Sequence, residues 1–221
     1  MIEPVWRITW FTIACAAGAT LLILPPGVVL AWLLARRKFP GRGLVETFVS
    51  LPLVMPPVAT GLILLMLLSR RGRVGALLER LGIEVVFTWK AVVLAMAIMG
   101  LPLLVRTARA GFEQVNVRYE RVAATLGAPP ARIFLTISLP LAWPSVLAGA
   151  VLAFARALGE FGATIIVAGN IPGATRTLAV AIYGYAETGQ HSQAFALLLV
   201  SVSIAFVALW TANRLVERST A

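Results

Sequence analysis

Residues 8–35 form a run of 28 residues without a charged side chain, and this run constrains the fold more than any other feature. A bilayer core is crossed by ~20 helical residues, so this run is long enough to span a membrane with a tilt, or with a bend at Pro25 and Pro26. The short apolar core and small-residue cleavage site of a signal peptide are missing. We therefore predict a first transmembrane helix that is retained.

The composition extends this prediction to the whole chain. Of its 221 residues, 60% are hydrophobic and 13% charged, whereas a soluble domain is nearer half apolar and a quarter charged. The net charge of +10 comes from basic residues beside apolar runs, which favours membrane topology over nucleic-acid binding. A single cysteine, Cys15, and a single histidine, His191, provide neither an internal disulfide nor a metal site. We expect one all-α membrane domain over residues 1–221, without a cofactor.

Apolar runs and their flanking charges predict five transmembrane helices. The spans are placed at residues 8–35, 47–68, 85–105, 139–157 and 194–212. Basic residues mark the cytoplasmic side by the positive-inside rule, and they gather after the first span, around the third loop and at the C-terminus: Arg36, Arg37, Lys38, Arg42, Arg106, Arg109, Arg118, Arg121, Arg132, Arg214 and Arg218. The N-terminus is then outside and the C-terminus cytoplasmic. Residues 69–84, predicted to be outside, are also basic and argue against this topology.

Two apolar segments are interrupted by helix breakers. Residues 47–68 contain Pro52, Pro56 and Pro57, so we expect this span to be kinked or broken and packed within protein. Residues 161–190 are apolar but broken by glycines and a proline. We interpret them as a re-entrant or interfacial outer segment, because non-helical backbone at membrane depth must be buried in protein or line a wet cavity.

The loop over residues 117–137 contains two short helical patterns separated by a bend. One helix face is formed by residues at spacings of three and four, namely Tyr119, Val122, Ala123 and Leu126. Gly127 is suited to the left-handed C-cap, and two prolines then prevent continuation of the helix. A second short helix is expected over residues 131–137, leading into the next span. The small side chains of Ala123 and Ala124 would let this helix-turn-helix loop sit close against another protein.

The loop resembles the EAA loop of ABC-importer permeases, whose pattern is a glutamate, two alanines, a glycine and an I-x-L-P ending. Matching positions are occupied by Glu120, Ala123, Gly127, Ile137, Leu139 and Pro140. Val122 stands where one alanine is usual. The resemblance implies that these residues, with Ala124, couple the chain to an ATPase. The alternative is an amphipathic connector that contacts only lipid headgroups, although such a helix needs no glycine–proline break.

Residues 39–65 and 155–183 resemble the molybdate branch of the same family, most clearly in the runs LGEFG and NIPG. The resemblance implies the type I ABC importer permease fold and a multi-pass homodimer in the bacterial cytoplasmic (inner) membrane, surrounded by lipid. It also implies two cytoplasmic ATPase subunits and a periplasmic or extracellular oxyanion-binding protein. Tungstate or sulfate remain alternative substrates, because both are tetrahedral dianions like molybdate.

The sequence carries no catalytic motif. It has no Gly-Lys dipeptide and hence no P-loop, and no nucleophile–histidine–acid set, so ATP hydrolysis is expected in a partner. A path for a dianion would use hydroxyls, amides and backbone N–H groups. Candidates lie in the broken segments: Ser50, Thr60, Gly162, Thr164 and Asn170. For the two residues of the second span we favour hydrogen bonds to their own helix, and for the glycine close packing is an equal alternative.

Arg156 and Glu160 lie four residues apart, and we interpret them as a structural ion pair rather than a gate. Two other classes of protein fit the sequence less well. An ion-coupled secondary transporter needs an ionisable residue near the centre of a span, and none of the five predicted spans has one. A membrane-anchored scaffold would leave unexplained the prolines in three successive spans around a cytoplasmic loop.

Overall fold

The computed structural model describes residues 4–220, apart from the side chains of residues 212 and 215–220, so Arg218 lies outside the described side chains. The described residues form helices and loops, with no strand among them. Four helical segments are long and apolar enough to cross a membrane: α1 (Val5–Arg36), α5 (Trp89–Gln114), residues 130–158 ending in α8 (Leu139–Leu158), and α11 (His191–Thr220). The bent pair α2 (Arg42–Val54) and α3 (Pro57–Leu68) is a fifth crossing if it is counted as one span.

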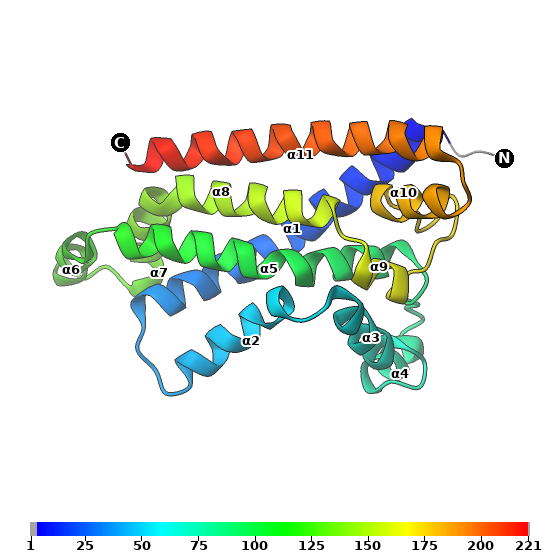
Figure 1. Ribbon diagram of the computed structural model, residues 1–221. Coiled ribbons are helices and arrows are strands. Elements are labelled where there is room, and N and C mark those ends of the chain that lie inside the picture. Colours follow the sequence, from blue (N-terminus) through cyan, green and yellow to red (C-terminus); the bar gives the residue numbers. More distant parts are fainter. Residues whose placement is uncertain (1–3, 221) are drawn as a thin grey trace.

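The helix α5 lies at the centre of the fold and packs against α8 and α1. Figure 1 shows α5, α8 and α11 side by side, with α1 crossing them diagonally. Small residues permit the α5–α8 contact: a Cβ on Gly149 would lie 3.1 Å from the Leu104 carbonyl oxygen, and one on Gly111 would collide with Ser145. Close approach of backbones through small residues is a common way to hold membrane helices together.

The predicted break in the second span is confirmed. Helices α2 and α3 meet at an angle of 112° around Met55 and Pro56. Met55 is extended, as expected of a residue before proline, and Pro57 occupies the first turn of α3, where a missing N–H costs nothing. Within one chain no residue of α2 is fully buried, although Val45 and Val49 pack against the core, so packing of this half of the span within protein stays a prediction. Within one chain, α2 contacts the core mainly along α5.

The helices extend past two of the predicted boundaries. The second short helix is not separate from the fourth span, because α7 (Pro130–Ile133) and the π-helix η1 (Phe134–Ser138) continue into α8. The widened turn, in which the Leu139 N–H bonds to the Phe134 carbonyl, lies directly before Pro140 and lets the helix pass a residue that has no N–H. The third span, predicted to end at residue 105, continues as α5 to Gln114, which places Arg106 and Arg109 on a helix.

Residues 161–190 contain two helices, α9 (Gly162–Val167) and α10 (Leu178–Glu187). With 6 and 10 residues, both fall short of the ~20 that cross a bilayer core, and re-entry of this segment stays a prediction. Helix α9 lies against α3 at very short range: a Cβ on Gly61 would be 2.8 Å from the Ala163 Cα, and one on Gly162 would be 2.8 Å from the Pro57 Cβ. Packing therefore accounts for Gly162.

The two ends of the molecule differ in what they carry. Figure 1 shows α6 (Val117–Thr125), the α1–α2 connection and the C-terminus at one end. The N-terminus, α9, α10 and the short helix α4 (Arg73–Arg80) lie at the other. We call these the loop end and the opposite end. The arrangement matches the predicted topology, in which the first group is cytoplasmic and the second is outside.

Candidate coupling loop and translocation groove

Helix α6 has well-formed caps. Its start is capped by Asn116, whose side-chain oxygen accepts a hydrogen bond of 2.9 Å from the Arg118 N–H. At its end Gly127 is left-handed with φ +82°, which confirms the predicted C-cap. The Gly127 N–H bonds to the Ala124 carbonyl at 3.0 Å, and the Ala128 N–H bonds to the Ala123 carbonyl at 3.1 Å. This pair of bonds is the Schellman motif, which fixes the direction in which the chain leaves the helix.

Glu120 points into its own subunit. Its Oε1 accepts hydrogen bonds from the Arg36 Nε at 2.9 Å and from the Ser138 hydroxyl at 2.7 Å. The Arg36 Nη2 also donates to the Val115 carbonyl at 2.7 Å. The Arg36 and Glu120 side chains are only 10% and 16% exposed, so the pair is largely shielded from water. The carboxylate therefore ties α6 to the end of α1 and to η1.

The contacts of Glu120 give Arg36 and Ser138 a role that the sequence does not reveal. The sequence indicates Arg36 only as a topology charge and assigns no role to Ser138. The two residues lie 84 and 18 positions from Glu120, so no local pattern connects them. The serine within the I-x-L-P ending, one residue before Leu139, is the only local hint.

The outer face of α6 is apolar and uncovered within this chain. Tyr119, Val122 and Leu126 are exposed, the last at 82%. These are the large members of the predicted helix face. Ala124 is exposed beside them, whereas Ala123 is half-buried. Three large apolar side chains over about two turns of a projecting helix make a surface suited to a protein partner.

The remaining residues of the resemblance lie at the base of the loop. Ile137 and Leu139 are half-buried, and Leu139 packs against the cluster that joins α1, α5 and α8. Pro140 is exposed at the start of α8. The structure therefore separates the predicted coupling residues into an exposed face on α6, an internal anchor at Glu120 and a packed base.

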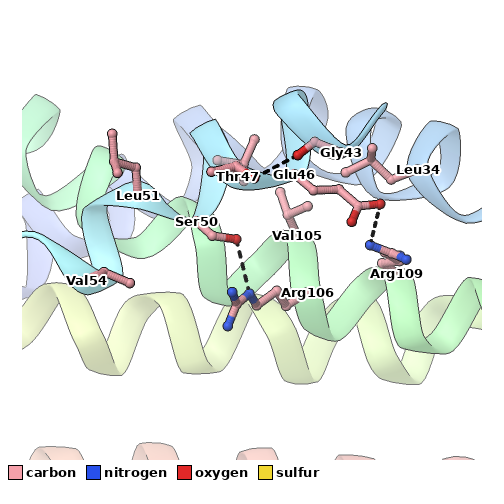
Figure 2. A pocket seen from close by; sticks show the side chains of 11 residues that line it. Leu34, Gly43, Glu46, Thr47, Ser50, Leu51, Val54, Val105, Arg106 and Arg109 are labelled. Carbon is pink, nitrogen blue, oxygen red and sulfur yellow. Dashed lines mark hydrogen bonds and ion pairs between the residues drawn. The ribbon is translucent and has the colours of Figure 1, made fainter. Parts of the chain in front are cut away.

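A groove of about 690 Å³ runs between α2 and α5 near the loop end. Figure 2 shows Leu51 and Val54 toward one end of it, the Glu46–Arg109 pair toward the other, and Ser50 with Arg106 between them. The Arg106 Nε donates to the Ser50 hydroxyl at 3.3 Å. Ser50 thus contacts the neighbouring helix, which differs from the expected hydrogen bond to its own helix.

The other path candidates lie elsewhere. Thr60 and Thr164 are buried on α3 and α9, the two helices in close contact, and neither hydroxyl has a hydrogen-bond partner among the described residues. The expected bond from Thr60 to its own helix is therefore not formed. Asn170 lies in a cavity of about 440 Å³ at the opposite end, where its Oδ1 accepts a bond of 2.8 Å from the Arg176 Nε. A path role for these residues stays a prediction.

Arg156 and Glu160 form the expected ion pair at 2.9 Å. Glu160 is 1% exposed and also accepts a hydrogen bond of 2.7 Å from the Ala163 N–H in the first turn of α9. The carboxylate therefore joins the end of α8 to the start of α9. This geometry is that of a structural pair.

The fold defines a class of membrane protein. The structure resembles a chain of the MetNI methionine ABC transporter in an inward-facing conformation, with a TM-score of 0.71 and 17% identity over 100% of both chains. The all-helical architecture is that of type I ABC importer permeases, as predicted.

The family follows from the sequence match. Residues 27–220 match the family described as binding-protein-dependent transport system inner membrane component, and the chain belongs to this family. It is 44% identical to a molybdenum transport system permease protein of Escherichia coli K12, over 99% of this chain and 98% of the relative. It is 36% identical to a sulfate transport system permease protein of the same organism, over 87% of this chain and 69% of that relative. The predicted family and the inner-membrane location are confirmed.

Proposed function

We propose that this chain is the membrane permease subunit of an ATP-driven importer that translocates molybdate across the bacterial inner membrane. The observation that carries the proposal is the anchored α6 with its uncovered apolar face, in a chain that matches a molybdenum permease almost from end to end. An exposed surface on a rigid support can transmit motion from a docked partner. A flexible surface connector would need neither the buried ion pair nor the glycine cap.

The partners follow from the two ends of the molecule. Two cytoplasmic ATPase subunits would each bind one α6, and a substrate-binding protein would deliver the oxyanion at the opposite end. Because the sequence lacks a P-loop, the chain itself is expected to hydrolyse no ATP. Lipid would cover the outer helix faces, where Trp6, Trp10 and Trp89 are exposed at the opposite end, as is typical of residues at a membrane interface. No surface is assigned to nucleic acid.

A homodimer would complete the path. Helix α2 buries no residue within one chain, although it carries Leu44, Phe48 and Val54 as large exposed apolar side chains. A second copy, related by a two-fold axis, could face this helix and enclose a path between the subunits. Each groove between α2 and α5 would then open toward that path.

The substrate is tested by reconstituting the chain with its ATPase and binding protein in vesicles. ATP-dependent uptake of labelled molybdate is expected, with tungstate competing well and sulfate poorly. Good import of sulfate without molybdate would overturn the substrate. Uptake that stops on dissipating the ion gradients but survives ATP depletion would instead indicate a secondary transporter.

A further inference from the structure

We infer that Arg106 and Ser50 form a transient oxyanion-binding site in the groove between α2 and α5. This inference rests on the proposed function, because the expected ligand is the transported tetrahedral dianion. It adds a position to the path: the middle of the groove, on the loop-end side of the break between α2 and α3.

The ion pairs around the groove distinguish Arg106 from its neighbour. Arg109 bonds to Glu46 at 2.8 Å and to Glu113 at 2.7 Å, so its charge is compensated twice. Glu46 is in addition bound by Arg42 at 2.9 Å. Arg106 forms no ion pair within the described part of the chain, and its side-chain partner there is the neutral Ser50 hydroxyl. Arg42 and Arg109 are balanced by Glu46 and Glu113. The one positive charge that remains in this group is that of Arg106.

The geometry at Arg106 suits a transient anion contact. Its N–H···O distance to Ser50, 3.3 Å, is longer than the usual 2.7–3.2 Å, so a stronger acceptor could replace the hydroxyl. A guanidinium presents a planar fork of donors that matches two oxygens of an oxyanion, and a serine hydroxyl can rotate to donate as well. Binding by one uncompensated arginine, with the Glu46 carboxylate nearby, would hold the anion without trapping it.

The order of residues along the groove supports this position. Leu51 and Val54 line the part nearest the break, and Glu46 with Arg109 line the part nearest the start of α2 (Figure 2). An anion passing the break would leave an apolar stretch and meet Ser50 and Arg106 as its first polar contacts. A charge needed only to set topology would not require a place inside the groove.

The test uses the complete transporter in vesicles, with Arg106→Gln, Arg106→Lys and Ser50→Ala. Glutamine keeps a donor for Ser50 but removes the charge, whereas lysine keeps the charge. The assay uses saturating molybdate-loaded binding protein. Arg106→Gln is expected to lower uptake about tenfold or more, because it removes a hydrogen bond from a charged group. Ser50→Ala is expected to lower uptake roughly threefold, because it removes a hydrogen bond from a neutral group. Arg106→Lys should retain clearly more uptake than the glutamine variant. Arg214→Gln, an exposed arginine on α11 that lines neither the groove nor α6, is the matched control and should match wild type.

Membrane level and ATPase co-purification should be unchanged in all variants, because the α6 surface is untouched. Wild-type uptake by Arg106→Gln would overturn the inference, as would equal losses in the lysine and glutamine variants. If the wild-type transporter itself imports no molybdate but imports another substrate, the proposed function fails, and the same variants assayed with that substrate decide the role of Arg106.

Discussion

At the scale of single residues, the sequence places the Glu120 carboxylate in the loop but does not reveal its contacts within the subunit. Glu120 belongs to a loop that resembles a coupling element, yet its oxygen is occupied by Arg36 and Ser138. A shielded, charge-assisted contact of this kind is stronger than an exposed one, and it leaves a costly unpaired charge when one partner is removed. We therefore propose that Glu120 positions α6, and that the exposed apolar residues of α6 form the surface on which the ATPase docks.

Removing either side of this anchor should uncouple transport. We expect Arg36→Ala and Glu120→Ala each to weaken ATPase co-purification and to reduce molybdate uptake by about tenfold, because a hydrogen bond to a charged group contributes roughly 1.5–3 kcal/mol. The double variant should lose little more than the worse single one, since both remove the same contact. Co-purification and uptake of the three variants check this. Fully additive losses would contradict a shared anchor.

At the scale of elements, local chemistry was predictable and long-range packing was not. Gly127 and the prolines at the α2–α3 break act on their own backbone, so the sequence was sufficient to place the cap and the bend. The continuity of α7 with α8 depends on a π-turn beside Pro140, which no periodic pattern marks. The Arg36–Glu120 contact and the Arg106–Ser50 contact join residues 84 and 56 positions apart, and only the fold brings them together.

The α6–α7 bend should be sensitive to backbone conformation rather than to side-chain volume. A Cβ at Gly127 would meet nothing within 4 Å, so any cost there comes from the left-handed φ of +82°. Gly127→Val should cost on the order of 1–2 kcal/mol and misdirect the loop, whereas Gly127→Asn should cost much less because asparagine tolerates this conformation. We expect normal membrane levels for both, but weakened ATPase association and lost uptake for valine.

Steric fit on the same helix gives a companion test. Ala123 is half-buried on α6, so Ala123→Glu would place a charge in a packed position. An unpaired charge in a packed interface costs several kcal/mol, so this variant should also lose association with the ATPase. Arg118→Ala, on the exposed flank, should change little. ATPase co-purification and ATP-dependent uptake are measured for each variant. Full association and uptake in both Gly127→Val and Ala123→Glu would show that α6 does not couple the subunits.

At the scale of the whole molecule, one side of the chain is well packed, and the side that carries α2 is not. Helices α1, α5 and α8 share buried clusters, whereas α2 has no buried residue and exposes apolar side chains beside a groove that carries charge. Composition predicted a membrane protein but could not show which helix would lack internal packing. Lipid could cover an apolar face, but it could not compensate the polar groove next to it. A second copy of the chain, as proposed above, would cover both the apolar face and the groove.

This argument predicts that α2 lies at the subunit interface. Cys15 is the only cysteine and is buried, so Cys15→Ser provides a background for single-cysteine cross-linking. Phe48→Cys on α2 should form a covalent dimer in membranes on mild oxidation, because two α2 helices would face each other across the two-fold axis. Phe206→Cys on α11 is the matched control: the two phenylalanines are similarly exposed in one chain, at 75% and 69%, but α11 packs on the far side of α8, where we expect lipid. Non-reducing electrophoresis separates the outcomes. A dimer through position 206 and none through position 48 would place the interface on α11 and remove the groove between α2 and α5 from the path.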